Sequence, residues 1–191
     1  MVRVLLALVC AGIITIAGPS LPAAQGVGAA PTEAVALKEF DAAIAEYVAM
    51  RRRLADEVRG PIPNSSSVEL NNASDSLAAA IQRARQDARV GDLFVTPVTP
   101  VLKRTVDAAA RTKELREALA TIDDEAPTVR EPKIHLRFPG ASQMATMPPT
   151  LLGVLPRLPK ELEYRIIGRF LVLRDIDAAL IVDYIPDLIP R

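Results

Sequence analysis

The chain has 191 residues, with 23 basic and 23 acidic side chains, one histidine, one cysteine and no tryptophan. This balance argues against nucleic-acid binding, which depends on many uncompensated Lys and Arg side chains. A single cysteine, Cys10, excludes an internal disulfide and a zinc site built from several thiolates.

Residues 1–24 have the pattern of a secretory signal peptide. Arg3 supplies a positive charge, the apolar run 4–18 follows, and small residues come next. We expect cleavage after this segment, or as late as residue 29. The alternative is an inner-membrane anchor through an uncleaved 4–18 segment, although a spanning helix needs about 20 apolar residues. Cleavage would remove Cys10 and leave a cysteine-free, nearly neutral chain that is periplasmic or secreted.

Residues 32–122 have the periodicity of helices. The first helix, 32–59, carries an apolar stripe at alternating spacings of three and four, with Arg51 in the remaining position. The apolar members of this stripe are Leu37, Phe40, Ile44, Tyr47, Leu54 and Val58. A second helix begins near Ser67 and stops at Gly91, and a third runs over 99–122. The connections are short enough for antiparallel neighbours, so we expect an antiparallel helical bundle or hairpin of about three helices.

Three consecutive arginines, Arg51, Arg52 and Arg53, stand near the end of the first predicted helix. Consecutive helical side chains point about 100° apart, so the three fan outward and do not form one phosphate-binding or lipid-binding patch. We therefore expect a solvated helix end.

Residues 123–160 contain seven prolines, which exclude long regular structure and predict a Pro-rich linker. Within it, 133–138 alternates enough to predict one short strand, and His135, the single histidine, lies in that alternation. A histidine base needs a nucleophile or a carboxylate partner, and the spacing reveals neither. A plain strand or surface histidine is the favoured interpretation.

Residues 161–191 have the pattern of a three-stranded antiparallel β-meander. Gly168-Arg169 fits a two-residue hairpin turn, which fixes the register of the strands on either side. In that register Glu163 lies opposite Arg174, which predicts a cross-strand ion pair. A third strand is expected near 180–185.

One face of this meander collects apolar side chains, and we predict it as an interaction surface. Its members are Leu162, Tyr164, Ile166, Leu171, Leu173, Leu180, Val182 and Tyr184. Asp183 is expected on the opposite, charged face, near Arg165. Because a three-stranded sheet cannot bury both of its faces, the apolar face must dock on the helices, on a partner or on another copy.

Several carboxylates are candidates for a metal site or for acid–base catalysis. Asp175-Ile176-Asp177 resembles the start of a calcium loop, but the glycine and the distal glutamate of such a loop are missing. Glu161, Glu163, Asp175, Asp177 and Asp183 offer pairs for glycosidic cleavage. Arginines beside Glu163 and Asp183 would keep those two ionised and unsuited to acid catalysis. We predict no catalytic, cofactor or metal site.

The tail resembles the tails of exported bacterial proteins of unknown function. The resemblance rests on 162–169, Leu173-Arg174-Asp175 and 180–183, which follow a proline-rich stretch, 155–159. It implies bacterial origin and an envelope or periplasmic location, and it brings no activity and no functional residue.

These observations predict an α+β fold and a non-catalytic envelope or periplasmic interaction or scaffold protein. Its partner would be an envelope protein or a second copy, with no nucleic acid, no cofactor and no membrane span after signal cleavage. One alternative is a hydrolase acting on envelope polymers, which requires His135 to meet Asp175, Asp177 or Asp183 in a pocket. Another is a carrier of small apolar ligands, in which the apolar face of the tail lines a cavity.

Overall fold

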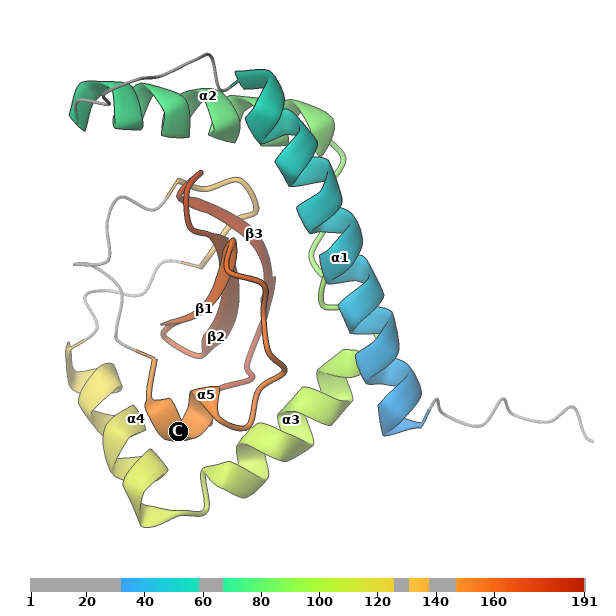
Figure 1. Cartoon of the computed structure of the whole chain (residues 1–191). Coiled ribbons are helices and arrows are strands. Elements are labelled where there is room, and N and C mark those ends of the chain that lie inside the picture. The colour runs from blue at the N-terminus through green and yellow to red at the C-terminus, as the bar shows by residue number, and fades with distance from the viewer. Residues whose placement is uncertain (1–31, 59–66, 126–130, 138–146, 191) are drawn as a thin grey trace, which may run out of the picture.

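The computed structural model describes residues 32–58, 67–125, 131–137 and 147–190 and has an α+β fold (Figure 1). Its helices are α1 (Glu33–Val58), α2 (Ser67–Ala84), α3 (Val98–Ala109), α4 (Lys113–Glu125) and α5 (Pro149–Leu152). Its strands are β1 (Leu162–Ile167), β2 (Phe170–Asp175) and β3 (Leu180–Ile185), which form one antiparallel sheet in the order β1-β2-β3. The predicted class and the predicted meander are confirmed.

The segment predicted as a signal peptide lies outside the described residues. Among the helices that are described, none combines the length and the hydropathy that a membrane crossing requires.

α1 occupies nearly the whole of its predicted range because nothing interrupts its apolar stripe. The side chains it buries are Ala36, Phe40, Ile44, Tyr47, Val48, Arg51 and Ala55. The outer members of the predicted stripe, Leu37, Leu54 and Val58, are only partly buried against the core. A straight helix drifts away from a strict 3.5-residue repeat, so the buried face follows the 3.6-residue period instead.

The single helix predicted over 99–122 is two helices, α3 and α4, which meet at a corner. Thr112 makes this break. Its hydroxyl donates to the Ala109 carbonyl (2.8 Å) and accepts from the Leu115 N–H (3.4 Å). A threonine in this position is a good N-cap, and it starts a new helix in a new direction. The spacing of apolar residues continues through the break, so this spacing by itself predicted one helix and no corner.

The helices surround the sheet (Figure 1). α1 runs along one side of it, α2 crosses near one end, and α3 and α4 meet in a V at the other. The core is therefore shared between helices and sheet. Three rings show this sharing: Phe40 of α1 stacks on Phe94 (centroids 5.7 Å apart), and Phe94 stacks on Tyr164 of β1 (6.4 Å).

The β1–β2 hairpin has the predicted register. Ile167 pairs with Phe170 across Gly168-Arg169, and Gly168 has a φ of 55°, which glycine adopts without strain. The predicted ion pair forms, with Arg174 Nη1 2.6 Å from Glu163 Oε1. Burial disfavours the charged form of Glu163, but the hydrogen bonds from Arg165 and Arg174 outweigh it and hold the pKa of this carboxyl below its usual value.

A bulge in the β2–β3 pairing changes the predicted faces of β3. Leu173 pairs with Asp183, but Arg174 pairs with Ile181, so Val182 is an extra residue in β3. An extra residue shifts the alternation of side chains by one position. Tyr184 therefore pairs with Val172 and packs edge-on against Phe170 (5.8 Å), on the face opposite to the one predicted for it.

The same bulge turns Asp183 into the core, where it is fully buried, so its predicted place near Arg165 is wrong. Its carboxylate accepts four backbone N–H groups, from Gly91 (2.9 Å), Leu93 (2.8 Å), Phe94 (2.7 Å) and Tyr184 (2.8 Å). Gly91 has a φ of 93°, a conformation that favours glycine and lets this loop aim several N–H groups inward. Gly91 thus binds the sheet; α2 already ends at Ala84, before the stop predicted at Gly91.

The proline-rich segment contributes to the core. Met147, Leu151 of α5 and Leu155 are buried in the main hydrophobic cluster. The strand predicted over 133–138 is reduced to one antiparallel bridge between Arg137 and Leu180, because the backbone turns at His135 (φ 67°). Phe138 lies outside the described residues.

Replacing Asp183 tests the anchor between β3 and the loop at Gly91. Asp183→Ala leaves three loop N–H groups without their acceptor, and we expect a loss of about 3 kcal/mol in the free energy of unfolding. The control is Asp92→Ala in the same loop, which removes an exposed carboxylate and should cost less than about 1 kcal/mol. Guanidinium unfolding followed by circular dichroism measures both. Equal losses would contradict the anchor.

Candidate functional site

The apolar face predicted as an interaction surface lies in the protein's own core. Seven of its eight members are between 0 and 4 % exposed: Leu162, Tyr164, Ile166, Leu171, Leu173, Leu180 and Val182. They pack with residues of α1, α3, α4 and α5 in one hydrophobic cluster. Of the three ways to cover this face, the structure shows docking on the helices. In this arrangement the face offers nothing to a partner.

A charged cluster joins α1 to the far end of the hairpin. Asp175, at the end of β2, is fully buried and accepts from the Tyr47 hydroxyl (2.9 Å), Arg51 Nε (3.1 Å) and the Ala178 N–H (2.9 Å). Arg51 also pairs with Asp177, whose side chain is exposed. Burial opposes the charge of Arg51, but Asp175 and Asp177 outweigh it and raise its pKa.

The next arginine extends this cluster to the start of the hairpin. Arg52 donates from Nε (2.9 Å) and Nη2 (2.7 Å) to Glu161 Oε1, and Glu161 is 5 % exposed. Burial acts against ionisation of Glu161, yet the hydrogen bond from Arg52 prevails and lowers its pKa. The prediction of a solvated helix end is therefore wrong for Arg51, and Arg52 is partly engaged. An arginine within an apolar stripe was the signal that a buried carboxylate must face it.

This cluster is built to hold elements together. Each described carboxylate in it already accepts from an arginine, and burial followed by the charge of Asp175 raises the pKa of Tyr47 far above its usual value. A phenol that stays protonated is no general base near pH 7, and the carboxylate oxygens that accept from Arg51 and Arg52 are engaged within the protein.

His135 lies apart from the aspartates that the hydrolase alternative requires. Its backbone N–H donates to the Ile181 carbonyl (2.8 Å), its carbonyl accepts from Gln82, and its buried Nε2 has no partner among the described residues. Burial, and then the charge of Arg85, lower the pKa of His135. Asp175, Asp177 and Asp183 bond to other groups, and none of them bonds to His135.

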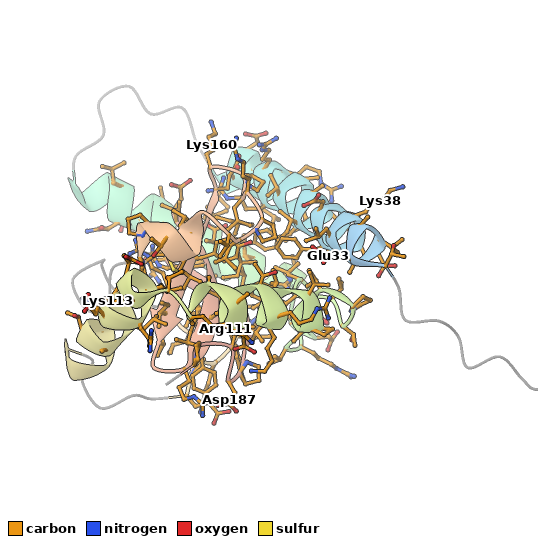
Figure 2. The ribbon with its side chains drawn as sticks, turned by 90° about the horizontal axis from the view of Figure 1, so that it is seen from below. Glu33, Lys38, Arg111, Lys113, Lys160 and Asp187 are labelled. Atoms are coloured by element: carbon orange, nitrogen blue, oxygen red, sulfur yellow. The ribbon has the colours of Figure 1, made fainter. Side chains whose placement is uncertain are left out.

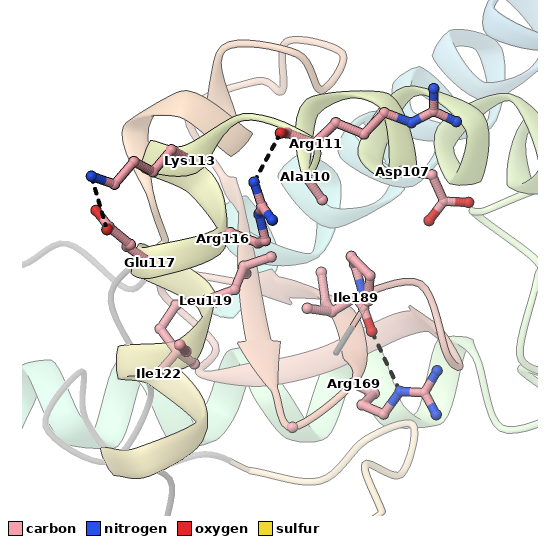
Figure 3. A pocket seen from close by; sticks show the side chains of 13 residues that line it. Asp107, Ala110, Arg111, Lys113, Arg116, Glu117, Leu119, Ile122, Arg169 and Ile189 are labelled. Atoms are coloured by element: carbon pink, nitrogen blue, oxygen red, sulfur yellow. Dashed lines mark hydrogen bonds and ion pairs between the residues drawn. The ribbon is translucent and has the colours of Figure 1, made fainter.

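A cleft of about 760 Å³ lies between the α3–α4 corner, the length of α4 and the turn of the β1–β2 hairpin (Figure 3). We call it the α3–α4 cleft. Its apolar lining includes Ala110, Leu119, Ile122 and Ile189, which are 4 to 9 % exposed. The break at Thr112 creates this cleft, because it bends α4 away from the line of α3.

Charged side chains form the rim of the α3–α4 cleft. Four are basic and two are acidic: Arg111, Lys113, Arg116, Arg169, Asp107 and Glu117. Seen from below, Arg111 and Lys113 lie at the corner of the two helices (Figure 2). An apolar floor with a few polar groups around it is the usual make-up of a small-molecule site.

A second cavity, of about 400 Å³, lies where the start of α1 meets α3 and residues 154–157. Its charged lining residues are Glu33, Asp41 and Arg157. It is smaller and carries more acidic than basic side chains. Neither cavity is lined by His135 or by Asp175, Asp177 or Asp183.

Arg51 and its neighbour test the charged cluster. Arg51→Met leaves Asp175 buried without its cationic partner, and we expect a loss of about 3 kcal/mol in the free energy of unfolding. Arg53→Met, two positions further along the same helix at an exposed side chain, should change it by less than about 0.5 kcal/mol. Urea unfolding measures both variants, and a small effect of Arg51→Met would count against the cluster.

The described residues contain no group of three or more His, Cys, Asp or Glu side chains that could hold a metal ion. No protein-family model, curated protein or solved structure matches the chain.

Proposed function

We propose that this chain is an exported, non-catalytic binding protein that carries a small apolar ligand in the α3–α4 cleft. The single observation that carries the proposal is the cleft itself. Its volume of about 760 Å³ falls within the range of about 300–1,000 Å³ that is typical of ligand pockets. Its floor is apolar, so the apolar part of a ligand would gain by leaving water.

Export is part of the proposal and rests on the sequence. The basic start, the apolar run 4–18 and the small residues after it follow the plan of a signal peptide. The resemblance of the tail to exported bacterial proteins of unknown function agrees with it and favours the cell envelope.

Two observations favour a carrier over the other functions considered. The hydrolase requires His135 beside an aspartate, and the described contacts of these residues are separate. The scaffold protein was to use the apolar face of the meander, and that face is buried by the chain's own helices. The ligand site is not that face, as first expected of a carrier, but the cleft next to the hairpin turn.

Filling the cleft tests this function. Ala120 lines the cleft and is exposed, so Ala120→Trp places a large ring in it without disturbing the core. We expect the wild-type protein to bind the neutral fluorescent probe N-phenylnaphthylamine and Ala120→Trp to bind it at least about tenfold more weakly, since a blocked pocket loses most of the buried ligand area.

The matched control is Thr121→Trp, the next residue of α4, which is exposed and does not line the cleft. It should bind the probe as the wild-type protein does. Failure of the wild-type protein to bind the probe, or an equal loss in both tryptophan variants, would contradict the proposed function.

A further inference from the structure

We infer that the ligand of the α3–α4 cleft is a single-chain amphipathic anion, an apolar chain that ends in a carboxylate or a phosphate and that binds with this group at Arg116. The inference rests on the proposed function and adds the chemical class of the ligand. Of the four basic side chains of the rim, some are paired with a carboxylate, and Arg116 is not.

Two of the four basic side chains already have acidic partners. Lys113 Nζ lies 3.7 Å from Oε1 of Glu117, one helical turn away, and Arg169 Nη1 lies 3.0 Å from Oδ1 of Asp187. Arg169 also donates to the Ile189 carbonyl (3.4 Å). Of the two acidic residues of the rim, Glu117 is therefore already paired. Asp187, the partner of Arg169, lies outside the rim.

Arg116 has no carboxylate partner among the described residues. Its Nη2 donates only to a neutral group, the backbone carbonyl of Arg111 (3.3 Å), which leaves most of its five N–H donors open. Figure 3 shows this guanidinium at the upper end of the cleft, beside Ala110. Arg111 also has no ion pair among the described residues, and its side chain extends along α3 toward Asp107 (Figure 3).

The apolar lining runs away from Arg116. Leu119 comes next along α4, followed by Ile122, while Ile189 faces them from the C-terminal segment (Figure 3). A ligand with its charge at Arg116 would therefore lay its chain over these three side chains. The arrangement has one cationic end and one apolar end, which is the complement of an amphipathic anion.

The chemistry of the guanidinium explains why the head group should be a carboxylate or a phosphate. Both present oxygens in a geometry that accepts two parallel N–H bonds from one guanidinium. Such a contact beside apolar side chains is less screened by water than one on an open surface. A neutral chain of the same length would gain only the apolar part of the binding.

Displacement of N-phenylnaphthylamine from the full chain tests the inference, with decanoate, decyl phosphate and decanol as competitors. We expect decanoate or decyl phosphate, or both, to bind the wild-type protein about fivefold or more tightly than decanol, the gain of a hydrogen-bonded charge pair at a partly exposed site. The tighter of the two anions identifies the head group.

Arg116→Gln should remove this preference, so that both anions bind no more tightly than decanol does. The control is Arg104→Gln, an exposed arginine of α3 outside the cleft, which should keep the preference. If decanol competes as well as both anions do, or if Arg116→Gln keeps the preference, the inference is overturned while the proposed function stands. If the wild-type protein binds neither the probe nor any of the chains, the proposed function fails and the inference with it.

Discussion

The buried carboxylate of Asp175 holds the helical part of this protein to its sheet. It ends β2 inside the core, and its charge is compatible with that place because Arg51 and Tyr47 of α1 reach it. Asp183 does the same for β3 and the loop at Gly91. A buried charge that loses its partner is strongly destabilising, so these contacts fix one docking of sheet on helices. In that docking the helices bury the apolar face of the meander.

This docking also determines where a ligand could bind. With the apolar face of the sheet covered, the larger of the two described cavities lies at the other end of the hairpin, where its turn approaches α4. Thr112 bends the chain there, and the two helices on either side of it form the walls of the α3–α4 cleft. The binding function that we propose thus depends on a helix break and not on the most apolar segment of the sequence.

The sequence predicts the elements whose signals are local. The stripe of α1 and the turn at Gly168-Arg169 are of this kind, and so is the Glu163–Arg174 pair that follows from the turn. Features that depend on contacts between residues far apart in the chain could not be predicted from the sequence. The bulge at Val182 appears only when β3 meets β2. Arg51 resembled a surface arginine because its partner lies more than a hundred residues away. The cleft could not be predicted because its walls come from three separate segments of the chain.

Native-state hydrogen exchange tests most directly whether helices and meander form one unit held by these buried charges. The most protected amides of α1 and of β2 should exchange with the same free energy, equal to that of global unfolding, because neither can open without exposing Asp175 and the shared core. A free energy for β2 well below that of α1, with α1 still protected, would show that the meander opens by itself and would contradict the account.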